Sequence, residues 1–257
     1  MLELAFFTIL GLLFAGMLGM QIAGHRFASR RARDDPFATS EGTAAIEAAL
    51  YALLGLLVGF TFAGAQDRLT TRRVLIVDEA NAVGTAYLRL DLLPPEDQPV
   101  LRDDMRRYVD ARLAFYDKLL DLRVARADKQ RCDELQQALW KHAVAASGKV
   151  ADSRAALLVL QSLNQMFDLA GARYAALRNH TPVAIFIQLV FIALTCAFFA
   201  GIGMAKRRRP SFLHMIMFAG VIAITAYVIL NLEFPRVGFV RMRLFDVLLR
   251  EQRAAMG

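Results

Sequence analysis

The stretch from Val77 to Pro94, VDEANAVGTAYLRLDLLP, holds the strongest candidates in this sequence for side chains with a chemical role. Apolar residues recur through it at steps of four and three, which predicts a helix packed by that face into a bundle. Its other side is polar and small, and it could line a path for hydrated ions, contact another backbone, or form an ordinary solvated surface. The candidate side chains are Asp78, Glu79, Asn81, Thr85 and Arg89.

A second candidate is Glu47, which lies one turn into an apolar run. A carboxylate at membrane depth costs about 2.5 kcal/mol or more unless it is paired or faces water. Glu47 could therefore mark a functional site, or it could lie in the headgroup layer, where the N-terminal helix dipole favours it. Farther along the run, Gly55, Gly59 and Ala63 form a line of small residues, which suits close packing against a helix of this chain or another copy.

Motifs for catalysis and metal binding are absent from the sequence. The four histidines are far apart and form no HExxH pair, so no metal site is predicted. GxSxG, Walker A and GxGxxG motifs are also absent. We therefore predict no catalytic residue and no cofactor, and we expect that the chain is not an enzyme.

Four runs of the sequence contain no charged residue. A helix needs about 20 apolar residues to cross a bilayer, so the runs predict four transmembrane helices in an inner (plasma) membrane. They extend from Leu4 to Gly24, Ala48 to Ala65, Pro182 to Ala205 and Pro210 to Leu232.

Charge in the short loops predicts the orientation of the chain. Four arginines between His25 and Gly42, and the wholly basic run Lys206 to Arg209, would lie on one side of the membrane. The positive-inside rule places that side in the cytoplasm. The segment between the second and third spans would then be periplasmic or extracellular, although arginines such as Arg68 and Arg72 crowd that side too.

Residues 66–181 form the long interruption between the second and third spans. They contain 18 Lys plus Arg and 16 Asp plus Glu, and few prolines or glycines interrupt them, so long helices are favoured. We predict an antiparallel helical bundle here, and no soluble linker separates it from the second span. The expected packing positions are Ile76, Ala80, Val83, Tyr87 and Leu90, then Leu101, Met105, Tyr108, Phe115, Leu119 and Leu122 with a break at Arg112, then Leu135, Leu139 and His142 or Ala143, then Leu157, Leu160, Asn164, Phe167, Gly171 and Tyr174.

The predicted fold is therefore all-α, with four transmembrane helices and the bundle inserted between spans two and three. Residues 1–65 would hold spans one and two, 66–181 the bundle, 182–235 spans three and four, and 236–257 an amphipathic C-terminal helix. Of the net charge of +7, residues 66–181 carry +2, and the remaining +5 lies beside the apolar runs. Nucleic-acid binders instead gather charge on a working face, so no nucleic-acid partner is expected.

The run EANAVGTAYLR with its LLP ending, and the stretch LEFPRVGFVRMRLFDVLL, resemble the bacterial bestrophin-like family of membrane proteins. Glu233, Pro235, Gly238 and Arg241 match the closing motif of that family, with Phe234 before the proline as a small departure. The resemblance implies likeness to bestrophins, which are pentameric anion channels whose helical region is cytoplasmic, the reverse of the orientation that the loops predict.

Two functions follow as expectations. The first is an oligomeric ion channel or permeation pathway, with the bilayer, ions and further copies of the chain as partners. The alternative is a non-conducting scaffold or envelope sensor that binds a protein through its bundle.

Overall fold

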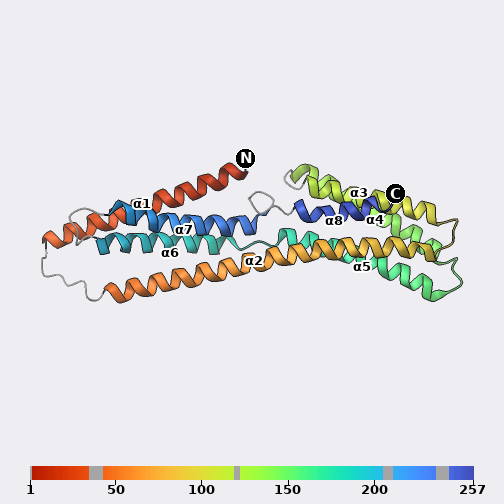
Figure 1. Cartoon of the computed structure of the whole chain (residues 1–257), viewed down its shortest axis with the longest axis horizontal. Helices are drawn as coiled ribbons and strands as arrows, with labels where there is room; N and C mark the ends of the chain where they lie inside the picture. The colour runs from red at the N-terminus through yellow and green to blue at the C-terminus, as the bar shows by residue number, and fades with distance from the viewer. Residues whose placement is uncertain (1, 35–42, 119–121, 205–210, 236–242) are drawn as a thin grey trace. The chain divides into compact units, whose positions relative to one another are not determined.

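The computed structural model describes residues 2–34, 43–118, 122–204, 211–235 and 243–257, and every regular element in these ranges is helical (Figure 1). The helices are α1 (Leu2–Asp34), α2 (Thr43–Arg89), the 3-10 turn η1 (Leu90–Leu92), α3 (Gln98–Asp117), α4 (Leu122–Ser147), α5 (Ser153–Arg178), α6 (Val183–Gly203), α7 (Phe212–Glu233) and α8 (Arg243–Ala254).

Four stretches of these helices are long and apolar enough to cross a membrane. They are found within Leu4–Arg31, Ala45–Leu92, Ser153–Gly203 and Phe212–Glu233. The basic run from Lys206 to Arg209, the expected packing position Leu119 and the motif positions Gly238 and Arg241 lie outside the described residues.

The chain folds into two compact units. The first holds Met1–Leu69 and His180–Arg241, and the second holds Thr70–Asn179 and Met242–Gly257. Helix α2 belongs to both units and is one helix of 47 residues, which confirms that no soluble linker follows the second span. It ends at Arg89 and passes into η1, which ends where Leu93 adopts an extended conformation before Pro94, because a residue that precedes proline is disfavoured in the helical region.

The first unit is held together by an unusually close approach of α1 and α6. A Cβ atom added to Gly24 would lie 2.0 Å from the carbonyl oxygen of Phe198, and one added to Gly201 would lie 2.0 Å from that of Gln21. The two backbones can approach this closely only because both positions lack a side chain. Met17, Leu54 and Cys196 are buried in the core of this unit.

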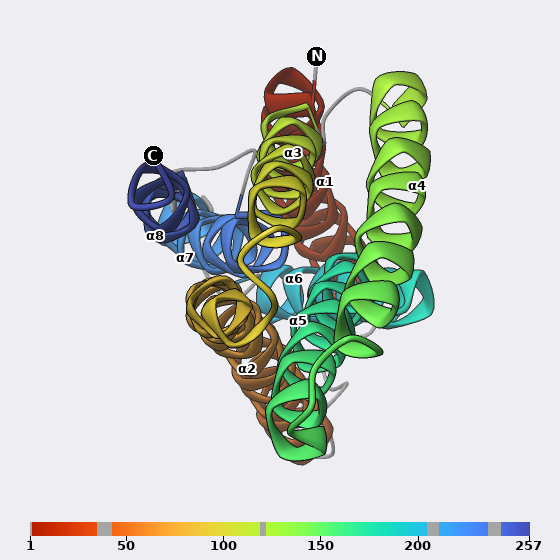
Figure 2. The same ribbon diagram turned by 90° about the vertical axis from the view of Figure 1, so that its right-hand side faces the viewer.

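The second unit is a helical bundle, and Figure 2 shows its helices α3, α4, α5 and α8 on the side that faces the viewer. Ile76, Val83, Leu101, Tyr108 and Leu139 are each at most 1% exposed, as their spacing predicted. The C-terminal helix α8 packs on α3, with Leu249 buried and Arg253 Nε donating to Asp110 at 2.8 Å. At the start of α5, the Asp152 carboxylate accepts from the backbone N–H of Arg154 and caps the helix.

The predicted packing face of α5 is only partly confirmed: Leu160, Phe167 and Tyr174 pack against buried residues, but the other three positions do not. Leu157 is 64% exposed, and Asn164 and Gly171 are also exposed. The buried line instead consists of Val159, Leu163, Met166, Ala170 and Arg173. Apolar residues cover more than half of this helix, so its periodicity alone permits either line. The buried line includes Arg173, whose Nη1 donates to Glu79 of α2.

Candidate functional site

One side of α2 is exposed along the part of the helix that belongs to the first unit. Ala52, Leu56, Gly59 and Ala63 follow one another at steps of four, three and four, and all are exposed. No atom outside their own helix segment lies within 4 Å of a Cβ added to Gly55 or Gly59. Of the predicted helix-packing residues, Gly55 and Gly59 therefore face no other helix among those that the structure describes, and Ala63 is exposed.

Large apolar side chains are exposed on all of these helices. Leu4 of α1 is 73% exposed, Phe191 of α6 69% and Leu213 of α7 69%, and on α2 itself Phe60 is 67% exposed. Side chains of this kind are suited to lipid chains. The line from Ala52 to Ala63 also carries exposed alanine and glycine, a composition found where helices approach each other within membranes.

The part of α2 in the second unit also has an exposed side, and here it is more polar. Asn81 and Thr85 are exposed, and Asp78 is partly exposed at the edge of the same face. Arg89 lies farther round, partly buried, with its Nη1 donating to the carbonyl oxygen of Leu158 at 3.1 Å. Four of the predicted residues thus lie on or beside one face.

Glu47 lies on a different side of α2 from this face. It precedes Ala52 by five residues, which corresponds to about 140° around a helix of 3.6 residues per turn. Its Oε2 lies 4.0 Å from the position of a Cβ added to Gly203 of α6, and the residue is partly buried. The structure therefore directs Glu47 toward another helix of its own unit.

Glu79 was expected on the flank or outer surface of α2, and the structure places it inside the bundle at 1% exposure. Its Oε1 accepts from Arg112 Nε at 2.8 Å, and its Oε2 accepts from Arg173 Nη1 at 2.6 Å. Both arginines are at most 3% exposed. The expected break in the packing of α3 at Arg112 is also wrong, because that side chain lies within the buried face as the partner of Glu79.

Tyr116 completes this buried cluster of Glu79, Arg112, Arg173 and Tyr116. The Arg173 guanidinium lies 3.5 Å from the centre of the Tyr116 ring, and Arg112 donates to the Tyr116 hydroxyl. Burial raises the pKa of Tyr116 above its ordinary value, although Arg112 opposes the shift. Burial alone would lower the pKa of Arg112, but Tyr116 and Glu79 raise it. The cluster therefore keeps Arg112 charged and the tyrosine protonated.

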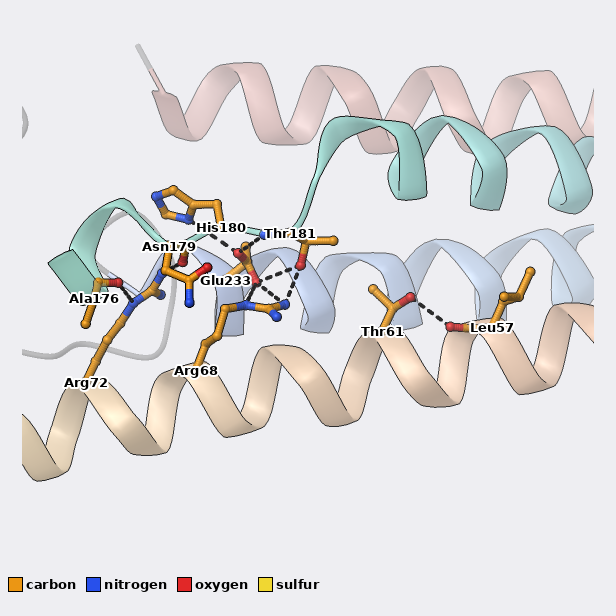
Figure 3. Close-up of polar contacts among 9 residues, drawn as sticks. All are labelled: Leu57, Thr61, Arg68, Arg72, Ala176, Asn179, His180, Thr181 and Glu233. Atoms are coloured by element: carbon orange, nitrogen blue, oxygen red, sulfur yellow. Dashed lines mark hydrogen bonds and ion pairs between the residues drawn. The ribbon is translucent and has the colours of Figure 1, made fainter.

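A second buried carboxylate, Glu233, lies at the end of α7 in the first unit and is 0% exposed. It accepts from Arg68 Nη2 at 2.8 Å and from the backbone N–H of Thr181 at 2.7 Å (Figure 3). The Nδ1 of His180 lies 3.3 Å from Oε1, and the imidazole stacks on Phe234. This cluster joins α2, α7 and the segment before α6. Sequence reasoning noted Glu233 only through the family motif.

Arg72, in the second unit, caps the end of α5. Its Nε donates to the carbonyl oxygen of Ala176 at 3.1 Å, and its Nη2 donates to that of Asn179 at 2.7 Å. The last carbonyl groups of a helix have no partner within the helix, so Arg72 satisfies groups that would otherwise be buried without one. The side chain is 3% exposed and acts in packing.

The chemistry of these groups is that of charge pairing and packing. Within the described part of the chain, no group of three or more His, Cys, Asp or Glu residues could hold a metal ion. Glu79 and Glu233 are each enclosed by protein donors. Of the predicted side chains, Asn81 and Thr85 are exposed on α2, and the face of α2 that carries them is the candidate functional site.

Comparisons with known proteins agree with this architecture. A family profile described as a bestrophin-like domain matches residues 6–243. The fold is similar to crystal structures of three single-substitution variants of a bacterial bestrophin homolog from Klebsiella pneumoniae. The TM-scores are 0.70, 0.66 and 0.67, at 14%, 14% and 13% identity. The matches cover 96%, 96% and 93% of this chain and 97%, 98% and 96% of those chains. No curated protein matches the chain in sequence.

Proposed function

Because the chain belongs to the bestrophin-like family, we propose that it is a multi-pass protein of the inner (plasma) membrane that forms a homo-oligomer and conducts ions along α2. In this proposal, residues 1–65 and 182–235 hold the four spans. Residues 66–181 form an extramembrane bundle between spans two and three, and residues 236–257 add the C-terminal helix.

The small residues on the exposed line of α2 carry this proposal. Ala52, Gly59 and Ala63 are exposed there, and small side chains allow another helix to come close, so a second copy of the chain is the expected neighbour. A single copy cannot enclose a path with one helix face. Several copies, each turning this face toward a shared axis, can do so.

The polar end of the same helix supports conduction over simple packing. Asn81 and Thr85 are exposed on it, and Asp78 borders them. Hydroxyl, amide and carboxylate groups can replace part of the hydration shell of a passing ion. Arg89 lies at the edge of this surface, and we do not assign Glu47 or Glu79 to the path, since both are directed into their own units.

Ion flux through vesicles tests the proposal directly. The purified protein in liposomes should release an ion gradient faster than empty vesicles, and Ala63→Trp should reduce that flux by filling the α2 face. Val221→Trp is the matched control, because Val221 is 56% exposed on α7, where the proposal places lipid. Absence of flux under several ionic conditions, or equal flux in both variants, would contradict conduction along α2.

The alternative function, a scaffold or sensor that binds another protein through its bundle, predicts a different assembly. It requires no ring of copies and no central path. Particle mass in lipid nanodiscs separates the two functions: a homo-oligomer agrees with the channel, whereas a monomer without flux agrees with the scaffold.

A further inference from the structure

A hollow of about 610 Å³ lies beside the last turns of α1. Its described lining residues are Ala23, Arg26, Phe27, Arg30 and Arg31. Spacings of three and four residues place all five on one side of the helix. The hollow therefore has a wall with three guanidinium groups and one aromatic ring.

The position of this wall along α1 corresponds to the boundary of the membrane. The uncharged run from Leu4 to Gly24 has 21 residues, which is about the length needed to cross the hydrocarbon core. Arg26 follows two residues later. Since α1 continues as a helix to Asp34, the three arginines are presented on a rigid element at the depth of the lipid headgroups.

The three guanidinium groups are accessible for binding. Arg26, Arg30 and Arg31 are exposed, and no hydrogen bond or ion pair joins them to another part of the chain that the structure describes. Other arginines of the chain are engaged: Arg68 binds Glu233 and Arg112 binds Glu79. Guanidinium groups bind phosphate through paired, charge-assisted hydrogen bonds.

Phe27 adds an apolar surface to the same wall. It is 53% exposed, and its ring centre lies 6.0 Å from that of Phe198 on α6. Gly24 and Gly201 hold α1 against α6 just before this point. Phosphate-binding groups above an aromatic ring match a lipid, whose phosphate adjoins its glycerol and acyl chains.

We propose that this wall is a binding site for the phosphate group of an anionic phospholipid such as phosphatidylglycerol. Arg26, Arg30 and Arg31 bind the phosphate, and Phe27 contacts the start of the acyl chains. Basic pockets at the ends of transmembrane helices bind anionic headgroups in this manner. The site does not depend on ion conduction, so it can be tested whether or not the protein is a channel.

The experiment measures lipid retention by native mass spectrometry on the full-length protein in detergent, with phosphatidylglycerol and phosphatidylcholine supplied in equal amounts. The wild type should retain phosphatidylglycerol in preference. The variant Arg26→Gln/Arg30→Gln/Arg31→Gln should lose about ten-fold or more of its affinity, equal to about 1.4 kcal/mol. Equal retention of both lipids by the wild type would overturn the proposal.

A matched control removes three charges elsewhere. Arg107→Gln/Lys141→Gln/Arg154→Gln changes three exposed residues of the second unit and should retain phosphatidylglycerol as the wild type does. Equal loss in both triple variants would show that only net charge matters and would overturn the site. The variant Phe27→Ala, which keeps all three arginines, should bind the lipid more weakly, and unchanged retention would remove Phe27 from the site.

A further arm separates lipid from free anion. Inorganic phosphate at millimolar concentration should compete poorly with phosphatidylglycerol, because it gains nothing from Phe27. If inorganic phosphate displaces the lipid completely and raises the melting temperature by itself, the site binds free phosphate and the lipid proposal is wrong. Size-exclusion profiles identify any variant that is misfolded. If the triple variant Arg26→Gln/Arg30→Gln/Arg31→Gln is misfolded, the comparison of Phe27→Ala with the wild type tests the site instead.

Discussion

Glu79 is the residue whose surroundings depend most on charge. Two guanidinium groups and a tyrosine hydroxyl enclose its carboxylate, and none of these side chains is more than 3% exposed. Charges removed from water are stable only when each has a partner of opposite sign. The cluster therefore fixes how α2, α3 and α5 meet.

Glu79→Gln should destabilise the bundle strongly. It keeps the side-chain size but leaves Arg112 and Arg173 buried without a carboxylate, at a cost of about 3 to 5 kcal/mol. The melting temperature of the purified protein in detergent measures this loss. Asp103→Asn is the control, because Asp103 forms an exposed pair with Arg107, and such pairs contribute about 1 kcal/mol or less. Equal effects of the two variants would contradict the importance of the cluster.

At the scale of helices, the contact of α1 with α6 is set by two glycines. Gly201→Ala should separate the helices, because the new Cβ would lie 2.0 Å from the carbonyl oxygen of Gln21. Overpacking costs about 1 to 3 kcal/mol, or more where backbone must move. Gly11→Ala is the matched control: nothing lies within 4 Å of its added Cβ, and alanine favours a helix over glycine. The melting temperatures should therefore change in opposite directions.

If α2 lines the ion path, the carboxylates on its exposed face predict which ions pass. Asp67 is exposed there, and Asp78 is partly exposed. Carboxylates at a pore wall favour cations, so Asp67→Asn/Asp78→Asn should lower the permeability of cations relative to anions. One charge at 4 Å in water contributes about 1 kcal/mol, or roughly a five-fold change.

The reversal potential of the reconstituted protein under a salt gradient measures this change. Asp103→Asn on α3 removes one exposed carboxylate away from that face and should leave the reversal potential unaltered. If the double variant carries current and its reversal potential is unaltered, the ions do not pass along Asp67 and Asp78. That result would not contradict ion conduction by the protein.

At the scale of the whole molecule, orientation in the membrane is decided by charge. Arg26, Arg30 and Arg31 gather beside the first span and pair with no carboxylate that the structure describes, whereas Arg68 and Arg72 are engaged within the protein. Positive charges in short loops favour the cytoplasm. We therefore expect the bundle on the opposite side, although the bestrophin resemblance implies a cytoplasmic one.

Cysteine labelling tests the orientation. In a background with Cys132→Ser and Cys196→Ser, Lys141→Cys in the bundle should react with a membrane-impermeant maleimide in intact cells with a permeable outer layer. Arg30→Cys should react only after lysis. The reverse pattern would establish a cytoplasmic bundle and would show that the short-loop charges do not set the topology.

The sequence by itself determined the features that depend on local properties of the chain. Uncharged runs of about 20 residues predict membrane helices wherever they occur, and Pro94 ends the helical run of α2 and η1 through its own covalent geometry. The same holds for the uninterrupted helix that continues beyond the second apolar run and for the apolar spacing of α2 and α3. The family resemblance, carried by short runs, is confirmed by a match over residues 6–243.

Only the tertiary structure decided which polar side chains are buried. Asp78 and Glu79 are adjacent in sequence and chemically alike, yet one is partly exposed and the other is enclosed. The partners of Glu79 lie 33 and 94 residues farther along the chain, and no local pattern records that distance. The same reason explains α5, because a helix apolar on several sides takes its buried face from the helices against which it packs.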